Sequence, residues 1–317
     1  MVNPDRRTHH WDDWDLETLL RHKQESGIAT SLVVPARNEA ATVGAVVSRV
    51  REALVESVAL LDEIVVIDSD STDDTHGIAT AAGATVHRSA DVRPDLGTFP
   101  GKGEAMWKAL FVTRGDLIVF MDADLLDWDT HFVPGLLGPL LTGEAALVKG
   151  FYERPLRAAD GSEAALEGGR VTELVGRPLI ALDWPELGWL VQPMAGEWAV
   201  RRDLLERLWV PTGYAVELAA LVDTLRLLGL DAIAQVDLGR RAHRHQALRD
   251  LGAMAVQIIA ASDRRARGVY PGEGVRQVGL HQHRVEGRTV VTEVRGIELT
   301  ERPPSVEVRP VVGGSAP

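Results

Sequence analysis

The chain has 317 residues, of which 45% are hydrophobic, with a formal net charge of −12 and no cysteine. These values allow a sizeable core, exclude disulfides and thiolate metal sites, and argue against a nucleic-acid partner, which would need clustered lysine and arginine. No run of 18 apolar residues and no signal-peptide pattern occurs, so we expect a cytoplasmic protein without a membrane partner.

Residues 1–29 are predicted to form a polar N-terminal arm that carries a short amphipathic helix. Its two tryptophans, Trp11 and Trp14, are expected to pack against the rest of the protein and not to bind a ligand.

Strand, polar loop and helix then alternate within residues 30–151. The first apolar strand ends in Pro-Ala-Arg-Asn-Glu at residues 35–39 and leads into a helical spacing over residues 40–54. The second ends in acidic and hydroxyl residues at 68–75, and helical spacing continues to residue 82. This alternation predicts an α/β fold with a mostly parallel, Rossmann-like sheet flanked by helices, and we assign this half to nucleotide-sugar binding.

Residues 100–104, Pro-Gly-Lys-Gly-Glu, open another helical segment and place Lys102 at its N-terminus. Glycine on each side would let the backbone approach a ligand, and a helix N-terminus favours an anion. The alternative is an ordinary glycine turn with a solvated lysine. Lysine is scarce in this chain, with only four residues, and this one precedes the strand described next, which favours a functional interpretation.

The apolar run at residues 117–121 ends in two carboxylates, Asp122 and Asp124. Mg²⁺ and Mn²⁺ prefer such hard oxygen ligands and usually combine one or two of them with phosphate oxygens of a substrate. Capping of the following turn is the alternative for an Asp pair. Since ligands of open parallel sheets bind beyond the carboxyl ends of the strands, the three polar strand ends are expected to converge on one site.

Residues 152–263 are predicted to form an acceptor-binding half. It begins with a loop expected to be mobile at residues 158–169, and it contains a helix at 216–228 and a strand at 232–238.

Residues 264–317 are predicted to form a C-terminal arm. Alternating residues around 288–294 indicate a β-hairpin suited to dimer contacts, and residues 302–317 are expected to be disordered.

Three further polar groups in the second half are candidate ligand contacts. The basic cluster at residues 240–245 offers imidazole for a metal and guanidinium for phosphate, or it is a solvated loop. Residues 168–172 suit an acceptor phosphate, or they start a helix with Thr172 as its cap. Glu197 and Glu217 lie in apolar surroundings, where each would accept sugar hydroxyls or pair with an arginine.

Together these residues resemble the nucleotide-sugar glycosyltransferases of the glycosyltransferase-A fold and, within that fold, the hexosyl-3-phosphoglycerate synthases. The similarity covers residues 30–262. The segments widely shared by such transferases are residues 35–39, 68–75 and 122–124. The more specific segments are residues 100–105, 138–143, 169–175 and 229–239.

The resemblance implies a retaining transferase that moves a hexose from GDP-mannose or UDP-glucose to the 2-hydroxyl of 3-phosphoglycerate, in the synthesis of mannosylglycerate or glucosylglycerate. It also implies Mg²⁺ or Mn²⁺ as cofactor and a homodimer. Mannose is favoured here, because Arg37 departs from the small or apolar residue of the glucosyl enzymes.

The family's functional residues carry over by motif position. The donor side comprises Pro35, Ala36, Arg37, Glu39, Asp68, Ser69, Lys102 and Asp122. The acceptor side comprises Gly169, Arg170, Thr172, Tyr214, Arg241 and His245, although the family has asparagine in place of His245. Asp124 and His243 would bind the metal, and the catalytic group would be Asp122, Asp124, Lys102 and Glu217.

The implied mechanism follows from charge. A metal and a nearby cation stabilise the negative charge that develops on the leaving diphosphate. No protein nucleophile is needed if the acceptor hydroxyl attacks from the leaving-group face, and Glu217 would then orient the sugar or support positive charge at the anomeric carbon. The alternatives are a polyprenyl-phosphate glycosyltransferase, which the lack of a membrane segment disfavours, and a metal-dependent phosphatase in which Asp122 attacks phosphorus.

Overall fold

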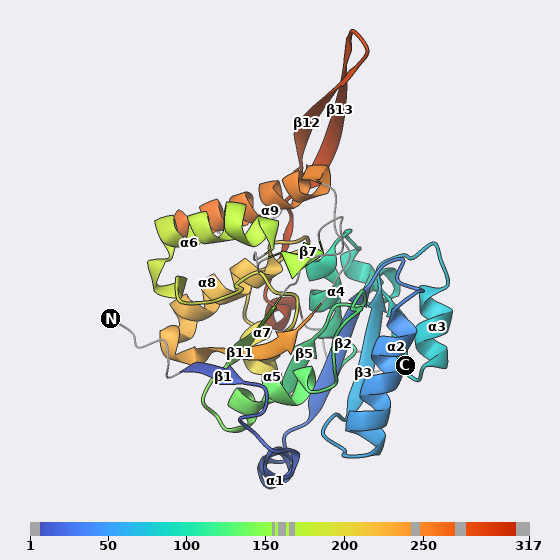
Figure 1. Cartoon of the computed structure of the whole chain (residues 1–317), viewed down its shortest axis with the longest axis vertical. Helices are drawn as coiled ribbons and strands as arrows, with labels where there is room; N and C mark the ends of the chain where they lie inside the picture. The colour runs from blue at the N-terminus through green and yellow to red at the C-terminus, as the bar shows by residue number, and fades with distance from the viewer. Residues whose placement is uncertain are drawn as a thin grey trace, which may run out of the picture.

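The computed structural model describes residues 7–153, 156–157, 163–164, 169–241, 248–269 and 277–308. An eight-stranded sheet runs through the molecule in the order β1-β11-β6-β9-β5-β2-β3-β4 (Figure 1). Its strands are β1 (Thr8–His10), β2 (Thr30–Ala36), β3 (Glu63–Asp68), β4 (Thr85–Arg88), β5 (Leu117–Phe120), β6 (Leu147–Glu153), β9 (Trp198–Arg201) and β11 (Ile233–Arg240).

The prediction of a mostly parallel α/β sheet is confirmed. Only β9 runs antiparallel to its neighbours, β5 and β6, within this sheet. The α-helices are α1 (Leu16–Ser26), α2 (Val43–Arg51), α3 (Thr75–Ala81), α4 (Lys102–Ala109), α5 (Phe132–Leu141), α6 (Arg177–Asp183), α7 (Arg202–Leu205), α8 (Val216–Leu228) and α9 (Leu248–Ala266).

The sheet is apolar on both faces, which explains why its strands are continuous apolar runs. Along β2, Leu32 and Val34 face a core that also contains residues of α1, α2, α3 and α5. Val33, between them, faces a second core with residues of α4, α6, α7, α8 and α9. Two helical layers therefore cover the sheet, and its polar strand ends remain for ligands. No helix among the described residues is long and apolar enough to cross a membrane.

The N-terminal segment differs from its prediction because it contributes a strand as well as a helix. β1 pairs in parallel with β11, with Thr8 opposite Gln235. Its three residues, Thr-His-His, carry no apolar alternation; backbone pairing holds them, together with a hydrogen bond from the side chain of Gln235 to the hydroxyl of Thr8 at 2.9 Å. The predicted packing of the tryptophans is confirmed, since Trp11 and Trp14 lie against the core. Residues 135 and 138 of α5 are glycines, which leave room for the Cα and Cβ of Trp11 and for the ring of Trp14.

The predicted C-terminal hairpin is confirmed. β12 (Gln277–Glu286) and β13 (Thr289–Glu298) form a two-stranded ribbon that projects from the body of the protein beyond α9 (Figure 1).

The prediction of disorder from residue 302 onward is wrong for residues 302–308, whereas residues 309–317 lie outside the described part. β14 (Glu301–Arg302) pairs with β10 (Val210–Pro211), and a 3-10 turn follows at Ser305–Val308. Arg302 forms a buried ion pair with Glu104 of α4, at 2.6 Å. That partner is 198 positions away, so the local composition gave no sign of it.

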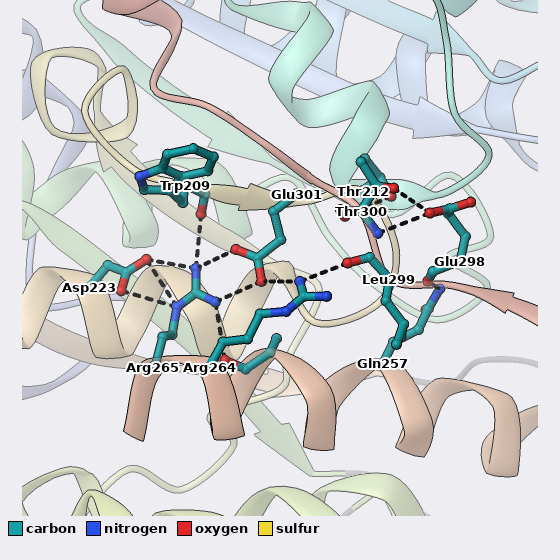
Figure 2. A network of polar contacts seen from close by, with 11 residues as sticks. Trp209, Thr212, Asp223, Gln257, Arg264, Arg265, Glu298, Leu299, Thr300 and Glu301 are labelled. Carbon is teal, nitrogen blue, oxygen red and sulfur yellow. Dashed lines mark hydrogen bonds and ion pairs between the residues drawn. The ribbon is translucent and has the colours of Figure 1, made fainter. Parts of the chain in front are cut away.

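A second buried ion network ties α9 to α8 and β14 (Figure 2). The Arg265 side chain is 1% exposed and lies 2.8 Å from Asp223 and 3.2 Å from Glu301. It also donates to the carbonyl of Trp209. This network anchors the helix that precedes the hairpin.

We expect Arg265→Met to lower the free energy of unfolding by roughly 3–5 kcal/mol at pH 7, because it leaves the carboxylate of Asp223 buried without its ion-pair partner and leaves Glu301 with Arg264 alone. The loss should shrink as the pH falls, since protonation removes that charge. Urea unfolding at pH 7 and pH 5 measures both effects. The control is Arg267→Met, in the exposed pair with Asp263, which should cost well under 1 kcal/mol. Equal losses in the two variants would contradict the role of the network.

Candidate active site

A cavity of about 1070 Å³ opens at the carboxyl ends of β2, β3 and β5. It brings together nearly all the residues predicted for the donor and acceptor sides. Its lining includes Pro35, Ala36, Arg37, Glu39, Ser69, Lys102, Asp122, Asp124, Gly169, Arg170, Thr172, Tyr214, Glu217 and Arg241. His243 and His245 lie outside the described residues.

Asp68, also predicted for the donor side, is 3% exposed and is not among the residues that line the cavity, so its contact with the donor stays a prediction. Its carboxylate accepts a hydrogen bond from the backbone N–H of Ser71, at 3.0 Å. The acidic residue at the end of β3 therefore shapes the loop that carries the neighbouring Ser69.

The loops that follow β2 and β3 hold each other in place. The backbone N–H of Ser69 donates to the carbonyl of Ala36, at 2.9 Å. Asn38 adopts a left-handed backbone, with φ of 58°, and its side-chain oxygen accepts from the N–H of Thr72, at 2.7 Å. The hydroxyl of Thr75 accepts from the N–H of Glu39, at 2.8 Å. Polar residues predicted as ligand contacts thus also build the wall of the cavity.

Lys102 occupies the first turn of α4, and its flanking glycines serve packing. A Cβ on Gly103 would lie 1.9 Å from the carbonyl oxygen of Pro211, and one on Gly101 would lie 2.3 Å from that of Thr212. Gly101 also lines the cavity, so the prediction that the glycines let a ligand approach the backbone stays a prediction. The close contact aims Lys102 at the end of β5.

The Lys102 amine links two acids from different elements. Its Nζ lies 2.6 Å from Asp122 Oδ1, beyond β5, and 2.9 Å from Glu217 Oε1, in the first turn of α8. The alternative of a solvated lysine is therefore excluded for Lys102.

Arg241 joins the site from the end of β11. Its side chain is 3% exposed, with Nη2 at 3.1 Å from Asp122 Oδ2 and 3.6 Å from Asp124 Oδ1. Its Nη1 lies 3.1 Å from Glu197 Oε2 and donates to the hydroxyl of Tyr152. For this arginine, the solvated-loop alternative is wrong.

The acidic side chains of the site differ in how far neighbouring positive charges offset their negative charge. Burial raises the pKa of Asp122, but the charges of Lys102 and Arg241 outweigh it and hold that pKa below its ordinary value. Burial, and then the charge of Asp122, raise the pKa of Asp124. Burial alone would lower the pKa of Lys102, but the charges of Asp122 and Glu217 outweigh it and raise that pKa. Of the Asp pair, Asp124 is therefore the acid with less cationic support.

That imbalance suits a divalent cation, because a further positive charge near Asp124 would relieve it. Among the residues described, no cluster of three or more His, Asp or Glu side chains with metal-binding geometry occurs. The donor set therefore fits an ion such as Mg²⁺ or Mn²⁺ that takes one or two carboxylates and completes its shell with phosphate oxygens and water.

On the acceptor side, Gly169, Arg170 and Thr172 reach the cavity from the segment that leads into α6. Thr172 begins the π-helical turn Thr172–Gly176, whose N-cap position is Val171. Thr172 is therefore not the cap that the alternative interpretation expected.

The sequence prediction did not assign a role to Lys149 or Tyr152, two residues of β6. Lys149 is fully buried beneath the site and donates to the carbonyl of Ala195, at 2.5 Å, and burial lowers its pKa to about 7. A lysine within the apolar run at residues 147–153, in a chain with only four lysines, was the available signal.

Comparison with known proteins places the chain in a family. The model for "Glycosyl transferase family 2" matches residues 31–209. The glucosyl-3-phosphoglycerate synthase of Mycolicibacterium smegmatis is 46% identical over 305 residues, which cover 95% of this chain and 97% of that protein. The glucosyl-3-phosphoglycerate synthase of Petrotoga mobilis is 42% identical, and the aligned region covers 80% of this chain and 78% of that protein.

Solved structures agree. The glucosyl-3-phosphoglycerate synthase of Mycobacterium tuberculosis, crystallised with Mn²⁺, UDP and glucosyl-3-phosphoglycerate, superposes with a TM-score of 0.82 at 43% identity, covering 96% of this chain and 99% of that one. The same enzyme with Mn²⁺, UDP-glucose and phosphoglyceric acid gives a TM-score of 0.81. With this similarity over nearly its whole length, the chain belongs to the glucosyl-3-phosphoglycerate synthases, within glycosyl transferase family 2.

Proposed function

We propose that this protein transfers glucose from UDP-glucose to the 2-hydroxyl of 3-phosphoglycerate, with retention at the anomeric carbon. The observation that carries the proposal is the charge cluster of Lys102, Asp122, Asp124, Glu217 and Arg241 on the wall of one large cavity. The M. tuberculosis relative was crystallised with this donor and with phosphoglyceric acid.

The expected preference for mannose finds no support, because the relatives named above are glucosyl enzymes. The phosphatase alternative is set aside by the family membership. A polyprenyl-phosphate acceptor is also disfavoured, because the relatives with near-complete coverage carry the name of a phosphoglycerate enzyme.

On the donor side, the nucleoside would lie between the ends of β2 and β3, against Pro35, Ala36, Arg37, Glu39 and Ser69. The same cavity is lined by these residues and by Lys102 and Asp122. This arrangement would place the diphosphate beside the Lys102 amine.

The chemistry needs positive charge where the sugar leaves the diphosphate. Lys102 supplies a cation whose pKa is raised by two neighbouring acids, so it stays charged throughout the neutral range. Asp124, together with His243, would hold the divalent cation, which when bound adds further stabilisation to the diphosphate oxygens. Glu217 accepts from Lys102 and faces the same cavity, which suits a carboxylate that orients the sugar.

On the acceptor side, Gly169, Arg170 and Thr172 would bind the phosphate of 3-phosphoglycerate. Tyr214 and Arg241 line the same cavity. Arg241, and by the family resemblance alone His245, would then bind the glycerate part. The acceptor hydroxyl would approach from the diphosphate side, and the leaving oxygen would take its proton.

The first test is the release of UDP from UDP-glucose, measured with and without 3-phosphoglycerate. Release should require the acceptor and Mg²⁺ or Mn²⁺, and EDTA should abolish it because the charge on the diphosphate is then uncompensated. GDP-mannose in place of UDP-glucose should turn over more slowly. Acceptor-independent release at the same rate, or equal use of a polyprenyl phosphate, would contradict the proposed acceptor.

The second test concerns Lys102. Lys102→Met should lower kcat by about 10²–10³-fold, because it removes one charge that stabilises the leaving diphosphate. Steady-state kinetics, normalised to folded protein, measures this. Lys108→Met is the control, since Lys108 lies in the same helix but donates to the backbone carbonyls of Val92, Arg93 and Gly97. That variant should lose stability and keep its kcat; a similar loss of kcat in both would argue against a direct role for Lys102.

We also propose that the protein is a homodimer that uses its hairpin. A lone two-stranded ribbon is marginally stable in water, yet β12 and β13 pair over ten positions. Val285, Val290 and Val294 are exposed on it by 74%, 63% and 58%. A second copy of the chain is the proposed cover for these side chains.

Sedimentation equilibrium tests the dimer. The native chain should sediment at twice its monomer mass, and the double variant Val285→Asp/Val290→Asp should be shifted toward the monomer, because two charges would be buried in the contact. Leu227→Asp, at an exposed apolar position of α8, should leave the mass unchanged. A monomeric native chain would refute this part of the proposal.

A further inference from the structure

A buried layer of side chains lies directly beneath Asp122 and Asp124. It is formed by residues 195–197, which precede β9, and by β6 next to them. Glu197 is 0% exposed, and Lys149 of β6 is 2% exposed. The mechanism above uses neither residue.

This layer is held firmly by the backbone. Lys149 Nζ donates to the carbonyl of Ala195, at 2.5 Å, and the N–H of Gly150 donates to the carbonyl of Glu197, at 2.9 Å. Gly196 lies against the carboxylate of Asp122, since a Cβ there would be 2.2 Å from Oδ2. The segment and Asp122 therefore cannot shift independently.

Glu197 and the Asp pair share one cation. The guanidinium of Arg241 lies between them, with Nη1 at 3.1 Å from Glu197 and Nη2 at 3.1 Å from Asp122 and 3.6 Å from Asp124. Arg241 and Glu197 are buried, and Asp122 and Asp124 are partly buried, so each attraction is stronger than it would be in water. The charge of Arg241 is thus divided between an acid below and two acids above.

We propose that Glu197 is a positioning residue that, through Arg241, sets how tightly the metal site at Asp124, next to Asp122, binds a divalent cation. This inference rests on the metal site proposed above. A metal ion and the guanidinium compete for the same carboxylate oxygens. Glu197 draws Arg241 away from those oxygens and keeps it in the site when the ion is present.

Substitutions at Glu197 and at Arg241 should then change the affinity for the metal ion in opposite directions. In Glu197→Gln, the charge of Arg241 is balanced only by Asp122 and Asp124. The guanidinium then competes more strongly with the metal ion for their carboxylate oxygens. Arg241→Gln removes the guanidinium that competes with the metal ion. It also leaves the negative charge of Glu197 uncompensated near the site, which favours binding of a cation. Both glutamines keep the site polar and close to its original volume.

The test is direct binding of Mn²⁺ to the full chain without substrates, measured by electron paramagnetic resonance of the free ion. Glu197→Gln should raise the Kd about tenfold or more, whereas Arg241→Gln should lower it. In the Arg241→Gln background, the added Glu197→Gln change should weaken binding much less than it does in the native chain, because the cation through which Glu197 acts is gone. Glu197→Asp, which keeps the charge, should bind Mn²⁺ more tightly than Glu197→Gln.

Asp223→Asn is the matched control, because it removes the carboxylate charge from another buried arginine pair, that with Arg265. It should lower stability and leave the Kd of folded protein unchanged. A Kd unaffected by Glu197→Gln, or weakened equally with and without Arg241, would overturn the inference. If Glu197→Gln fails to fold, tighter binding by Arg241→Gln is still required.

Asp124→Asn separates this inference from the proposed function. It should abolish the binding of Mn²⁺ if the metal site is right. Unchanged binding in this variant would overturn the metal site itself, and the role of Glu197 with it. Loss of binding in Asp124→Asn with no response to Glu197→Gln would overturn the role of Glu197 alone.

Discussion

The ion pair between Lys102 and Asp122 joins the start of α4 to the end of β5, and the arrangement of the site depends on it. Like charges of Asp122, Asp124 and Glu217 would repel one another at the same sheet edge, in a setting where water screens them poorly. Lys102 from one side and Arg241 from the other make their proximity tolerable. The cations come from helix and strand ends that the sheet order places around β5. The fold thus fixes both the acids and the charges that hold them.

Local signals in the sequence predicted the sheet and much of the cavity. The run before Asp122 and the residues at 35–39 are contiguous, and parallel strands end on one edge, so their convergence follows from topology alone. The helix at 216–228 was predicted with the same bounds because its apolar spacing is unbroken. The resemblance to the family supplied the acceptor segment at Gly169 and Arg170, which local rules interpret equally well as a helix start.

What could not be predicted depends on partners far apart in the chain. The contact between Glu104 and Arg302 spans 198 positions, and composition alone suggested that the segment of Arg302 was disordered. Glu197 was noted as a buried acid, but its pairing with Arg241 required knowing that the ends of β9 and β11 flank the same strand, β6. β1 was missed because backbone pairing, and no side-chain pattern, defines it.

The pairing of β1 with β11 also has a consequence for the order in which the protein is assembled. The first described strand of the chain forms an edge of the sheet against a strand more than 220 residues later, with Thr8 opposite Gln235. During synthesis from the N-terminus, Thr8–His10 must wait unpaired until nearly three quarters of the chain has emerged. β11 in turn, with its apolar Ala234, Val236 and Leu238, has an open edge until these residues cover it. The N-terminal residues thus cover, late in synthesis, a sheet edge that would otherwise favour pairing with another chain.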